Sequence, residues 1–287
     1  LDRIDVEAAA GVLYDAFGAV YRQRGHAPPF PTRDSAAWLC RAYLDLDPEG
    51  CAIAWDATQA VGVGFAHPRG AVTSIGPLAA RPGAPPGVAR ALMAELGRVA
   101  AQSGSLRLFQ DSFNPDSFGL YARLGYMVAD VAPYLLAEKM TPPVAPVAGV
   151  RAMRPDDIPT LERYDRARTA ADRRRDLALL ASTGSALVAL GAGGAMSGYL
   201  FYRPLPARVV IGPGVAESGE TMGDLVDGVA ATLPGRAAVI RGSAAAPSVL
   251  LRAFARGFRV DHLGNLMVAG PYTPPPAQLY ALFPESL

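Results

Sequence analysis

Cysteine and histidine are scarce in this sequence of 287 residues, which contains two of the former and three of the latter. Cys40 and Cys51 lie outside any C-x-x-C or Cys/His ligand spacing, so neither a disulfide framework nor a zinc site is indicated. We therefore expect no metal ion, and the reduced cytoplasm as the compartment of the protein.

A strong charge of either sign is also lacking. Charged residues make up 18% of the chain, the formal net charge is +1, and the lysines and arginines are scattered. This pattern excludes the electrostatic footprint of a nucleic-acid-binding or lipid-binding protein. The one basic run, the arginines at 173–175, is flanked by Asp172 and Asp176, which is typical of a solvated helix face.

Long apolar runs are missing as well. None approaches the roughly 20 residues that span a bilayer, and the start carries acids instead of the basic segment of a signal peptide. No membrane association is expected. The apolar fraction of 51% is ample for a buried core, and the length alone leaves one or two domains open.

Prolines are concentrated at residues 141–149, where Pro142, Pro143 and Pro146 prevent a helix or a central strand. This stretch predicts a boundary between a first half, residues 1–141, and a second half, residues 149–287.

The two halves repeat each other at a fixed offset. Residues 62–65 (GVGF) align with 198–201 (GYLF), 136 positions apart (198 − 62 = 136), and the same shift aligns IGP at 75–77 with IGP at 211–213. Shared proline and aromatic positions in the same order indicate an internal repeat.

Apolar periodicity predicts similar elements in both halves. In the first half it indicates helices at 6–24 and 33–44, a hairpin at 52–67, and strands at 72–79, 106–111 and 133–139, with a helix in each of the last two gaps. The second half opens with a strand at 150–154 that the first half lacks. We therefore expect the first strand of the first half to lie upstream of Leu1.

One segment narrows the choice among α/β folds. Residues 114–126 (NPDSFGLYARLGY) resemble the N-x-x-S-x-x-x-L-Y-x-x-L-G-F/Y segment of the GCN5-related N-acetyltransferases (GNATs). The resemblance covers the first half as a whole and extends more weakly to the second. It implies an α/β (α+β) protein of two tandem GNAT-like domains, each a mixed, mostly antiparallel sheet flanked by helices, with splayed central strands.

The resemblance also implies a site for acetyl-CoA or another acyl-CoA. In the family, a bulged strand presents backbone groups to the acyl-pantetheine, and a loop opens the next helix toward the pyrophosphate. The matching cofactor-binding positions are Leu78, Ala79, Ala80, Gly87, Val88, Ala89, Arg90, Asn114 and Ser117. The loop departs from the family pattern at 85–86, because two prolines there cannot donate hydrogen bonds.

Tyr121 matches the tyrosine of the motif, whose phenol would protonate the departing CoA thiolate as a general acid. A core position in contact with Leu124 and Tyr126 stays open as the alternative. The general base has three candidates, which are His67, Asp111 and Glu95.

The aromatic, proline-rich span at 21–38 has no counterpart of equal length in the second half. A stiffened aromatic loop suits the wall of an acceptor pocket, which predicts Phe30 and Trp38 as substrate residues.

The second half has lost parts of the pattern. Glu217 and Glu220 lie at the helix start that would receive a diphosphate, and Phe254 stands in place of the tyrosine. Acids at a helix start repel phosphate. We interpret this half as a degenerate copy that supports or covers the first.

The first hypothesis is an enzyme, a GNAT-family N-acetyltransferase that acts on a small-molecule amine by direct transfer, with the backbone near Leu78 polarising the thioester carbonyl. The second is a tandem GNAT-like ligand-binding or scaffold protein without catalysis, which the two loop prolines favour. A third is a longer acyl donor. We expect a monomer or a homodimer, with neither a nucleic acid nor a membrane as partner.

Overall fold

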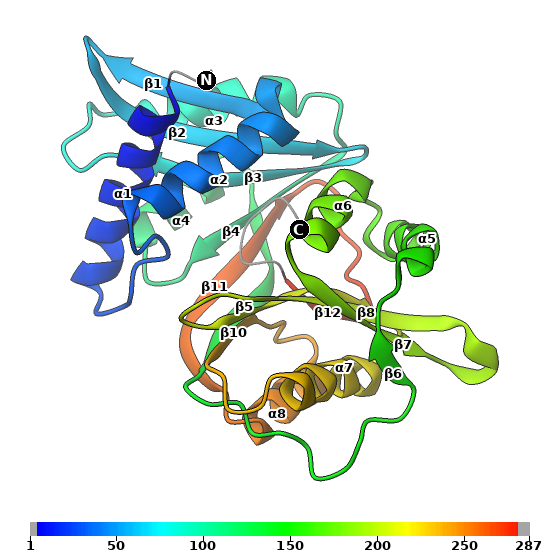
Figure 1. Cartoon of the computed structure of the whole chain (residues 1–287). Coiled ribbons are helices and arrows are strands. Elements are labelled where there is room, and N and C mark those ends of the chain that lie inside the picture. The colour runs from blue at the N-terminus through cyan, green and yellow to red at the C-terminus, as the bar shows by residue number, and fades with distance from the viewer. Residues whose placement is uncertain (1–4, 281–287) are drawn as a thin grey trace.

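The computed structural model describes residues 5–280, which form two lobes around one sheet (Figure 1). The elements of the first half are α1 (Val6–Gln23), α2 (Arg33–Leu46), η1 (Pro48–Gly50), β1 (Cys51–Asp56), β2 (Gln59–Arg69), β3 (Val72–Ala80), α3 (Val88–Val99), β4 (Ser105–Asp111), α4 (Pro115–Arg123) and β5 (Met127–Ala137). Those of the second half are β6 (Val150–Ala152), η2 (Pro155–Asp157), α5 (Ile158–Thr169), α6 (Arg174–Thr183), β7 (Ser185–Leu190), η3 (Ala192–Gly194), β8 (Met196–Pro204), β9 (Val209–Ala216), α7 (Gly219–Thr232), β10 (Ala238–Arg241), α8 (Pro247–Ala255), β11 (Arg259–Ala269) and β12 (Ala277–Leu279).

The predicted internal repeat extends to backbone detail. The ladder of β2 with β3 has an irregularity between Gly64 and Ala66, and that of β8 with β9 has one between Leu200 and Tyr202. Cis peptide bonds precede Pro77 and Pro213, again 136 positions apart (213 − 77 = 136). Both halves therefore fold in the same way from the hairpin onward, although only the second has a described strand corresponding to β6.

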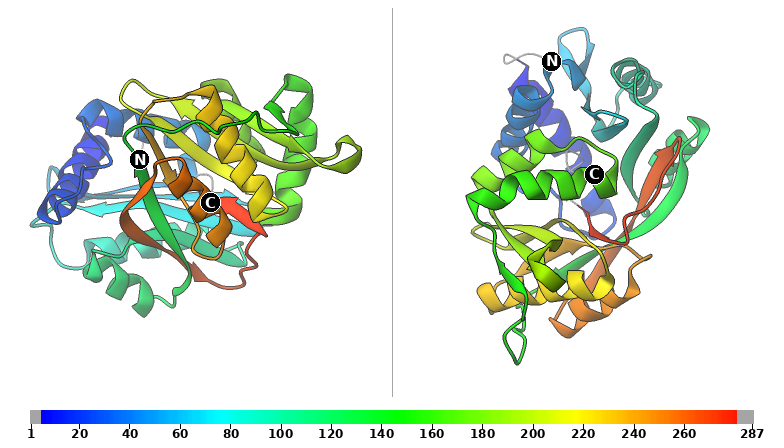
Figure 2. Two further views of the ribbon diagram at one scale, coloured as in Figure 1. Left: turned by 90° about the horizontal axis from the view of Figure 1, so that it is seen from below. Right: turned by 90° about the vertical axis from the view of Figure 1, so that its right-hand side faces the viewer.

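The two halves exchange one strand each. β11 of the second half lies between β4 and β5 of the first, and β5 lies between β11 and β10 (Figures 1 and 2). The sheets expected for two domains thus join into a single mixed, mostly antiparallel sheet of twelve strands within residues 5–280. The α/β fold class is confirmed, and the division at 141–149 stays a prediction about the sequence.

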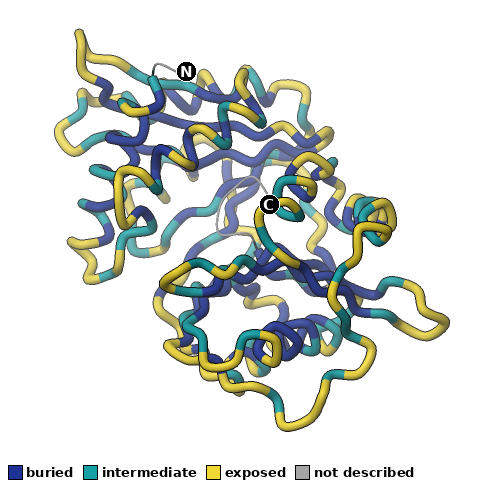
Figure 3. Tube along the Cα trace, viewed as in Figure 1, coloured by how far each residue is buried: buried dark blue, intermediate teal, exposed yellow. Residues whose placement is uncertain are grey.

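Helices cover both faces of the first lobe. Along β2, Phe65 packs against Tyr43 of α2, with ring centroids 5.1 Å apart, while a side chain at the adjacent Gly64 would meet Leu96 of α3. Successive strand residues point to opposite faces, so one strand contributes to two cores. Thr32 caps the start of α2, because its hydroxyl accepts a hydrogen bond from the backbone N–H of Ser35. Strands β2, β3, β8 and β9 are buried along most of their length (Figure 3).

A buried ion-pair network joins the two lobes. The guanidinium of Arg69, at the end of β2, donates to Asp47 of the first half at 2.8 Å and to Asp176 of α6 at 2.6 Å. His67 is fully buried beside it, 2.8 Å from Asp47. Each charge in this cluster is paired, as burial requires.

The arginine run at 173–175 differs in part from the prediction of a solvated face. Arg173 is buried and donates to Asp165 and to the hydroxyl of Tyr199, at 3.0 and 2.9 Å. Arg174 and Arg175 are exposed, as predicted. The residues that flank the run do not reveal this burial, because Asp165 lies eight residues before Arg173 and Tyr199 lies on β8.

Cys40 and Cys51 are buried free thiols. Among the described helices, none combines the length and the apolar character that a bilayer crossing requires.

Candidate active site

The central strands of the first half separate as the fold class predicts. β3 and β4 run parallel and pair only from Val72 to Ser74, opposite 105–107. Beyond this point β3 continues beside β2 as far as Ala80, and β4 continues beside β11 as far as Asp111. Among residues 5–280 no strand pairs with the backbone edges that face each other across the opening, and residues of both strands line a cavity there.

β3 is also bulged beside this opening. Ile75 lies opposite Ala66 and Leu78 lies opposite Gly64, so two residues, Gly76 and Pro77, face a single residue of β2. A bulge turns backbone groups out of the ladder and re-aims the strand.

A cleft between α3 and α4, here called the α3–α4 cleft, occupies the opening. It brings together eight of the predicted residues, namely Leu78, Ala80, Gly87, Ala89, Arg90, Asn114, Ser117 and Tyr121. Ala79 lines an adjoining hollow against α1. Val88 does not line the cleft, because its side chain is directed at Gly62 of β2.

The start of α3 faces this cleft. Gly87 precedes the helix with φ +94°, a conformation that favours glycine, and no acid lies in the first turn. The N–H of Val88 reaches only the carbonyl of Pro85, at 3.4 Å. The amides of Ala89 and Arg90 belong to the first turn and have no intrahelical acceptor. The prolines at 85–86 remove two N–H donors from the loop, but the free N–H groups in the first turn of α3 remain.

The start of α4 faces the same cleft and is held by both halves. The side chain of Asn114 accepts from the N–H of Ser117 at 3.3 Å and so caps the helix. Gln110 donates to the Ser117 hydroxyl at 3.1 Å and to the Asn114 carbonyl at 2.7 Å. Asn265, on the exchanged strand β11, donates to Gln110 at 2.8 Å. Strand exchange therefore positions the two predicted residues.

Tyr121 is 7% exposed and packs near Tyr126, with ring centroids 6.1 Å apart. It also lines the α3–α4 cleft. Burial, helped by Tyr126 and by the charge of Asp111, raises the pKa of Tyr121. The phenol therefore keeps its proton at neutral pH. Tyr121 is therefore a core residue that also borders the cleft, and its role as general acid stays a prediction.

A second cavity, here called the inner cavity, continues from the first. The two share Leu78, Asn114, Ser117 and Tyr121. Beyond them the inner cavity is lined by Phe17, Tyr21, Phe30, Phe109, Asp111 and Arg241. Phe30 therefore lines this cavity, and its role as a substrate residue stays a prediction. Trp38 lies elsewhere: it is 44% exposed, lines no described cavity, and has the guanidinium of Arg203 5.0 Å from its ring.

Of the three candidate bases, only Asp111 borders a described cavity. It accepts a hydrogen bond of 2.7 Å from the hydroxyl of Tyr21, and Nε2 of His262 lies 3.5 Å from its other oxygen. Burial acts to raise the pKa of Asp111, but the hydrogen bonds from His262 and Tyr21 outweigh it and lower the pKa. His67 is held within the buried network, and Glu95 pairs with Arg98 on the surface of α3.

His262 comes from β11 and is oriented by a bulge. The register of β11 against β5 shifts between Val260 and His262, so the side chains of Asp261 and His262 do not alternate as in a regular strand. Nδ1 of His262 lies 2.7 Å from Asp261. Burial lowers the pKa of His262, while Asp111 and Asp261 more than offset this and raise it. His26, Asp261 and His262 form a cluster whose potential metal-ligand atoms, the imidazole nitrogens and a carboxylate oxygen, lie within 4.8 Å of one another.

Sequence reasoning missed Tyr21, Arg241, Asn265 and His262 as site residues. Tyr21 lay in a span that had been recognised as aromatic. The other three belong to the second half, and no local pattern in the sequence indicates that β10 and β11 reach the site of the first half.

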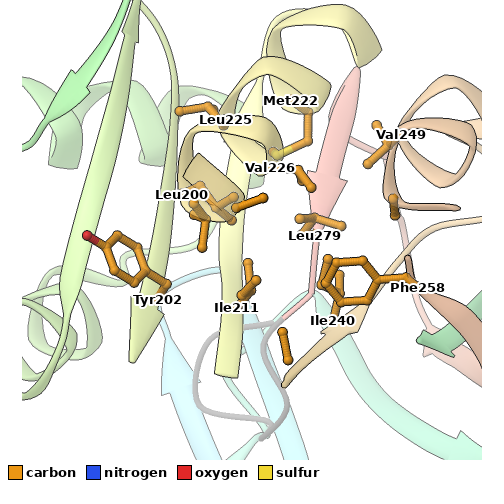
Figure 4. Close-up of a cluster of buried hydrophobic side chains, with 14 of the residues drawn as sticks. Leu200, Tyr202, Ile211, Met222, Leu225, Val226, Ile240, Val249, Phe258 and Leu279 are labelled. Carbon is orange, nitrogen blue, oxygen red and sulfur yellow. The ribbon is translucent and has the colours of Figure 1, made fainter. Parts of the chain in front are cut away.

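The corresponding opening of the second half is filled by the chain itself. β9 and β10 pair over 209–211 and then separate, and β12 pairs with β9 at 214–216 inside the gap. Leu279 of β12 is 2% exposed and lies among the side chains of α7 and β10 (Figure 4). Glu220 lies in the first turn of α7, and Ala246 caps α8 without a side-chain hydrogen bond. β12 thus occupies the gap between β9 and β10.

Known proteins resemble this chain in their fold, whereas sequence comparisons find no match. No protein-family model and no curated protein matches the chain. Solved structures do. A proposed acetyltransferase from Pyrococcus horikoshii superposes with a TM-score of 0.77 at 18% identity, over 99% of this chain and 92% of that one. A GCN5-related N-acetyltransferase from Sphaerobacter thermophilus gives 0.64 at 14% identity, over 96% of each chain.

A tandem GNAT protein from the clavulanic acid biosynthesis pathway, solved without AcCoA, gives a TM-score of 0.59 at 16% identity, over 95% of this chain and 97% of that one. Identity at this level establishes the fold and not the activity. Together with the repeated halves, the splayed strands and the capped helix at Asn114, these matches identify the chain as having the tandem fold of the GCN5-related N-acetyltransferases.

Proposed function

We propose that the protein is an N-acyltransferase that moves an acetyl group from acetyl-CoA to the amine of a small molecule by direct transfer. The single observation that carries the proposal is the opening between β3 and β4, into which the starts of α3 and α4 both point and in which Tyr121 lies. Two helix starts and unpaired strand edges offer backbone amides to a phosphate and to an amide-bearing arm.

The chain supplies each group that direct transfer needs. The first turn of α3, after Gly87, would receive the pyrophosphate, and the bulged strand at Leu78 would hold the arm and polarise the thioester carbonyl through the backbone. Arg90 adds a positive charge at the mouth of the cleft. The inner cavity, on the far side of Tyr121, would hold the acceptor.

In the reaction, the amine nitrogen forms a bond to the carbonyl carbon and the carbon–sulfur bond breaks. Asp111 takes a proton from the nitrogen as general base, and Tyr121 gives one to the departing thiolate as general acid. An ionised carboxylate and a protonated phenol are the states that their lowered and raised pKa values favour.

Calorimetry with acetyl-CoA tests the cofactor step, and release of free thiol with a set of small amines tests transfer. We expect acetyl-CoA to bind with a dissociation constant of about 50 µM or tighter. Absence of binding would favour the alternative, a tandem GNAT-like ligand-binding or scaffold protein. The two loop prolines at 85–86 support this alternative, because they cannot donate hydrogen bonds to a phosphate. Binding of a longer acyl-CoA in preference would indicate the third hypothesis.

A further inference from the structure

Two histidines and a carboxylate converge next to the proposed general base, although they lie far apart in the sequence. His26 follows α1 in the first half, and Asp261 and His262 lie on β11 of the second. Oδ2 of Asp261 lies 2.7 Å from Nδ1 of His262 and 3.4 Å from Nδ1 of His26. The expectation of no metal ion depends on local spacing in the sequence, and such spacing cannot reveal a cluster that the two halves assemble together.

A bulge brings Asp261 and His262 together. Neighbouring residues of a regular strand point to opposite faces of the sheet. In β11, Val260 lies opposite Leu135 and His262 lies opposite Tyr134, so Asp261 is an extra residue in the ladder. A bulge of this kind re-aims a side chain. The carboxylate therefore meets the imidazole of the next residue instead of lying on the other face.

Aromatic rings hold both imidazoles in place. The ring of His26 stacks on that of Phe113, with centroids 4.8 Å apart and planes at 21°, and the ring of His262 stacks on that of Tyr134 at 4.7 Å and 18°. The backbone N–H of His26 also donates to the carbonyl of Tyr21 at 3.0 Å, which fixes the loop after α1. The ligand nitrogens are thus positioned by packing, as a metal site requires.

Asp111 supplies the supporting contact that metal-bound histidines usually have. A histidine that binds a metal through one ring nitrogen commonly donates its other N–H to a carboxylate. Nδ1 of His262 faces Asp261, while Nε2 lies 3.5 Å from Oδ1 of Asp111. Tyr21 holds the other oxygen of Asp111 by a hydrogen bond of 2.7 Å.

The spacing of the three ligand atoms is close to that around a zinc ion. Ligand atoms of a tetrahedral zinc ion lie about 3.3 Å apart, since its bonds to nitrogen and oxygen are about 2.0–2.2 Å long. The separation of 3.4 Å fits this value, and the pair at 2.7 Å has to open by roughly 0.6 Å. The side chains of His26 and Asp261 are 20% and 30% exposed, which gives an ion a route from solvent and leaves room for water as a fourth ligand.

We propose that His26, Asp261 and His262 form a binding site for a divalent transition-metal ion, for which Zn²⁺ is the best match. An ion in this site would tie the loop after α1 to β11, and thereby the first half of the chain to the second. It would also direct Nε2 of His262 toward Asp111. The site lies outside the α3–α4 cleft and does not depend on the proposed function.

Titration with Zn²⁺ alone tests the proposal. The full chain is first freed of metal with a chelator, and binding is then followed by calorimetry. We expect one ion per chain with a dissociation constant of about 10 µM or tighter. The ion should also raise the melting temperature of the wild type. Absence of binding at about 100 µM Zn²⁺ overturns the proposal.

Two variants assign the ion to this cluster. His26→Gln and Asp261→Asn should each weaken Zn²⁺ binding by about 100-fold or more and abolish the rise in melting temperature. Glu138→Gln is the control, because Glu138 is an exposed acid that pairs with Arg259 of the same strand β11, and its affinity for Zn²⁺ should not change. Melting temperatures without metal show whether each variant is folded. Wild-type affinity in both His26→Gln and Asp261→Asn would place the ion elsewhere and contradict the proposal.

Discussion

The hydroxyl of Tyr21 donates a hydrogen bond of 2.7 Å to Oδ2 of Asp111. The bond joins α1 to the end of β4, and His262 approaches Asp111 from the exchanged strand. The carboxylate at the proposed acceptor site is thus oriented by both halves of the chain.

Replacement of Asp111 by Asn should lower kcat by about 100-fold, because the amide cannot take the proton of the amine. Affinity for acetyl-CoA, measured by calorimetry, should not change. Glu95→Gln is the control, since Glu95 lies on the surface of α3, paired with Arg98. A similar loss of kcat in both variants would contradict the choice of Asp111 over Glu95 as the general base.

Tyr121→Phe should lower kcat by about 100-fold while the affinity for acetyl-CoA stays within twofold or so, because only the proton donor is lost. Tyr126→Phe is the matched control and should keep wild-type kcat. The ring of Tyr126 lies 6.1 Å from that of Tyr121 in the same core, and it lines neither cavity. Wild-type turnover in Tyr121→Phe would assign Tyr121 to the core alone.

Gly87→Ala should weaken acetyl-CoA binding by about tenfold, because φ of +94° is unfavourable for alanine and the amides of α3 would shift. Its cost to the free energy of unfolding is about 1 kcal/mol. Gly97 lies in the same helix with open space around it, so Gly97→Ala should stabilise the protein by about 0.5–1 kcal/mol and leave binding unchanged. Equal affinities of the two variants for acetyl-CoA would mean that the start of α3 does not bind the phosphate groups.

Much of the local structure could be predicted from the sequence. The helix at 6–24 is observed as Val6–Gln23, and the strand at 72–79 as Val72–Ala80. Hydrophobic periodicity and caps are local signals, so they suffice for such elements. The closing strand, predicted at 133–139, begins earlier, at Met127, because its first residues pair with β11 from the other half.

The pairing between the halves could not be predicted. Val128 lies beside Met267, and no signal of periodicity reaches across so many residues. For the same reason Arg241 and His262 were not recognised as site residues. Trp38 was expected at the acceptor wall for its aromatic ring alone, and α2 instead carries it toward Arg203 of the second half.

Acetyl-CoA should bind with a stoichiometry of one per chain. β12 occupies the opening of the second half, and Glu220 adds a negative charge at the start of α7. Calorimetric titration of the wild type gives the ratio directly. Two sites per chain would contradict the view that β12 closes the second opening.

Asp47→Asn should lower the free energy of unfolding at pH 7 by at least about 2 kcal/mol. Burial opposes ionisation of Asp47, but hydrogen bonds from His67 and Arg69 outweigh it and lower the pKa from 3.8 to about 2. A lowered carboxyl pKa stabilises the folded state above the unfolded value and loses this effect as the pH falls through the folded value. The difference between wild type and variant should therefore shrink between about pH 4 and pH 2.

Urea unfolding at several pH values measures this difference. Burial raises the pKa of Asp176, which acts in the opposite sense, but Asp176 is present in both proteins. Glu7→Gln serves as the control, because its pair with Arg41 is exposed and should contribute less than about 1 kcal/mol. A difference that does not vary with pH would mean that Asp47 acts through packing and not through its charge.

The exchange of β5 and β11 bears on how such a chain can change over evolutionary time. A duplicated copy that loses its own chemistry is normally free to be deleted. Here the second copy has an acid at its phosphate position and a phenylalanine for its tyrosine, yet it supplies the strand that carries Asn265 and His262 to the first. Removing it would leave β4 with a bare edge, so under the proposed function selection for the site of the first half is enough to preserve both copies.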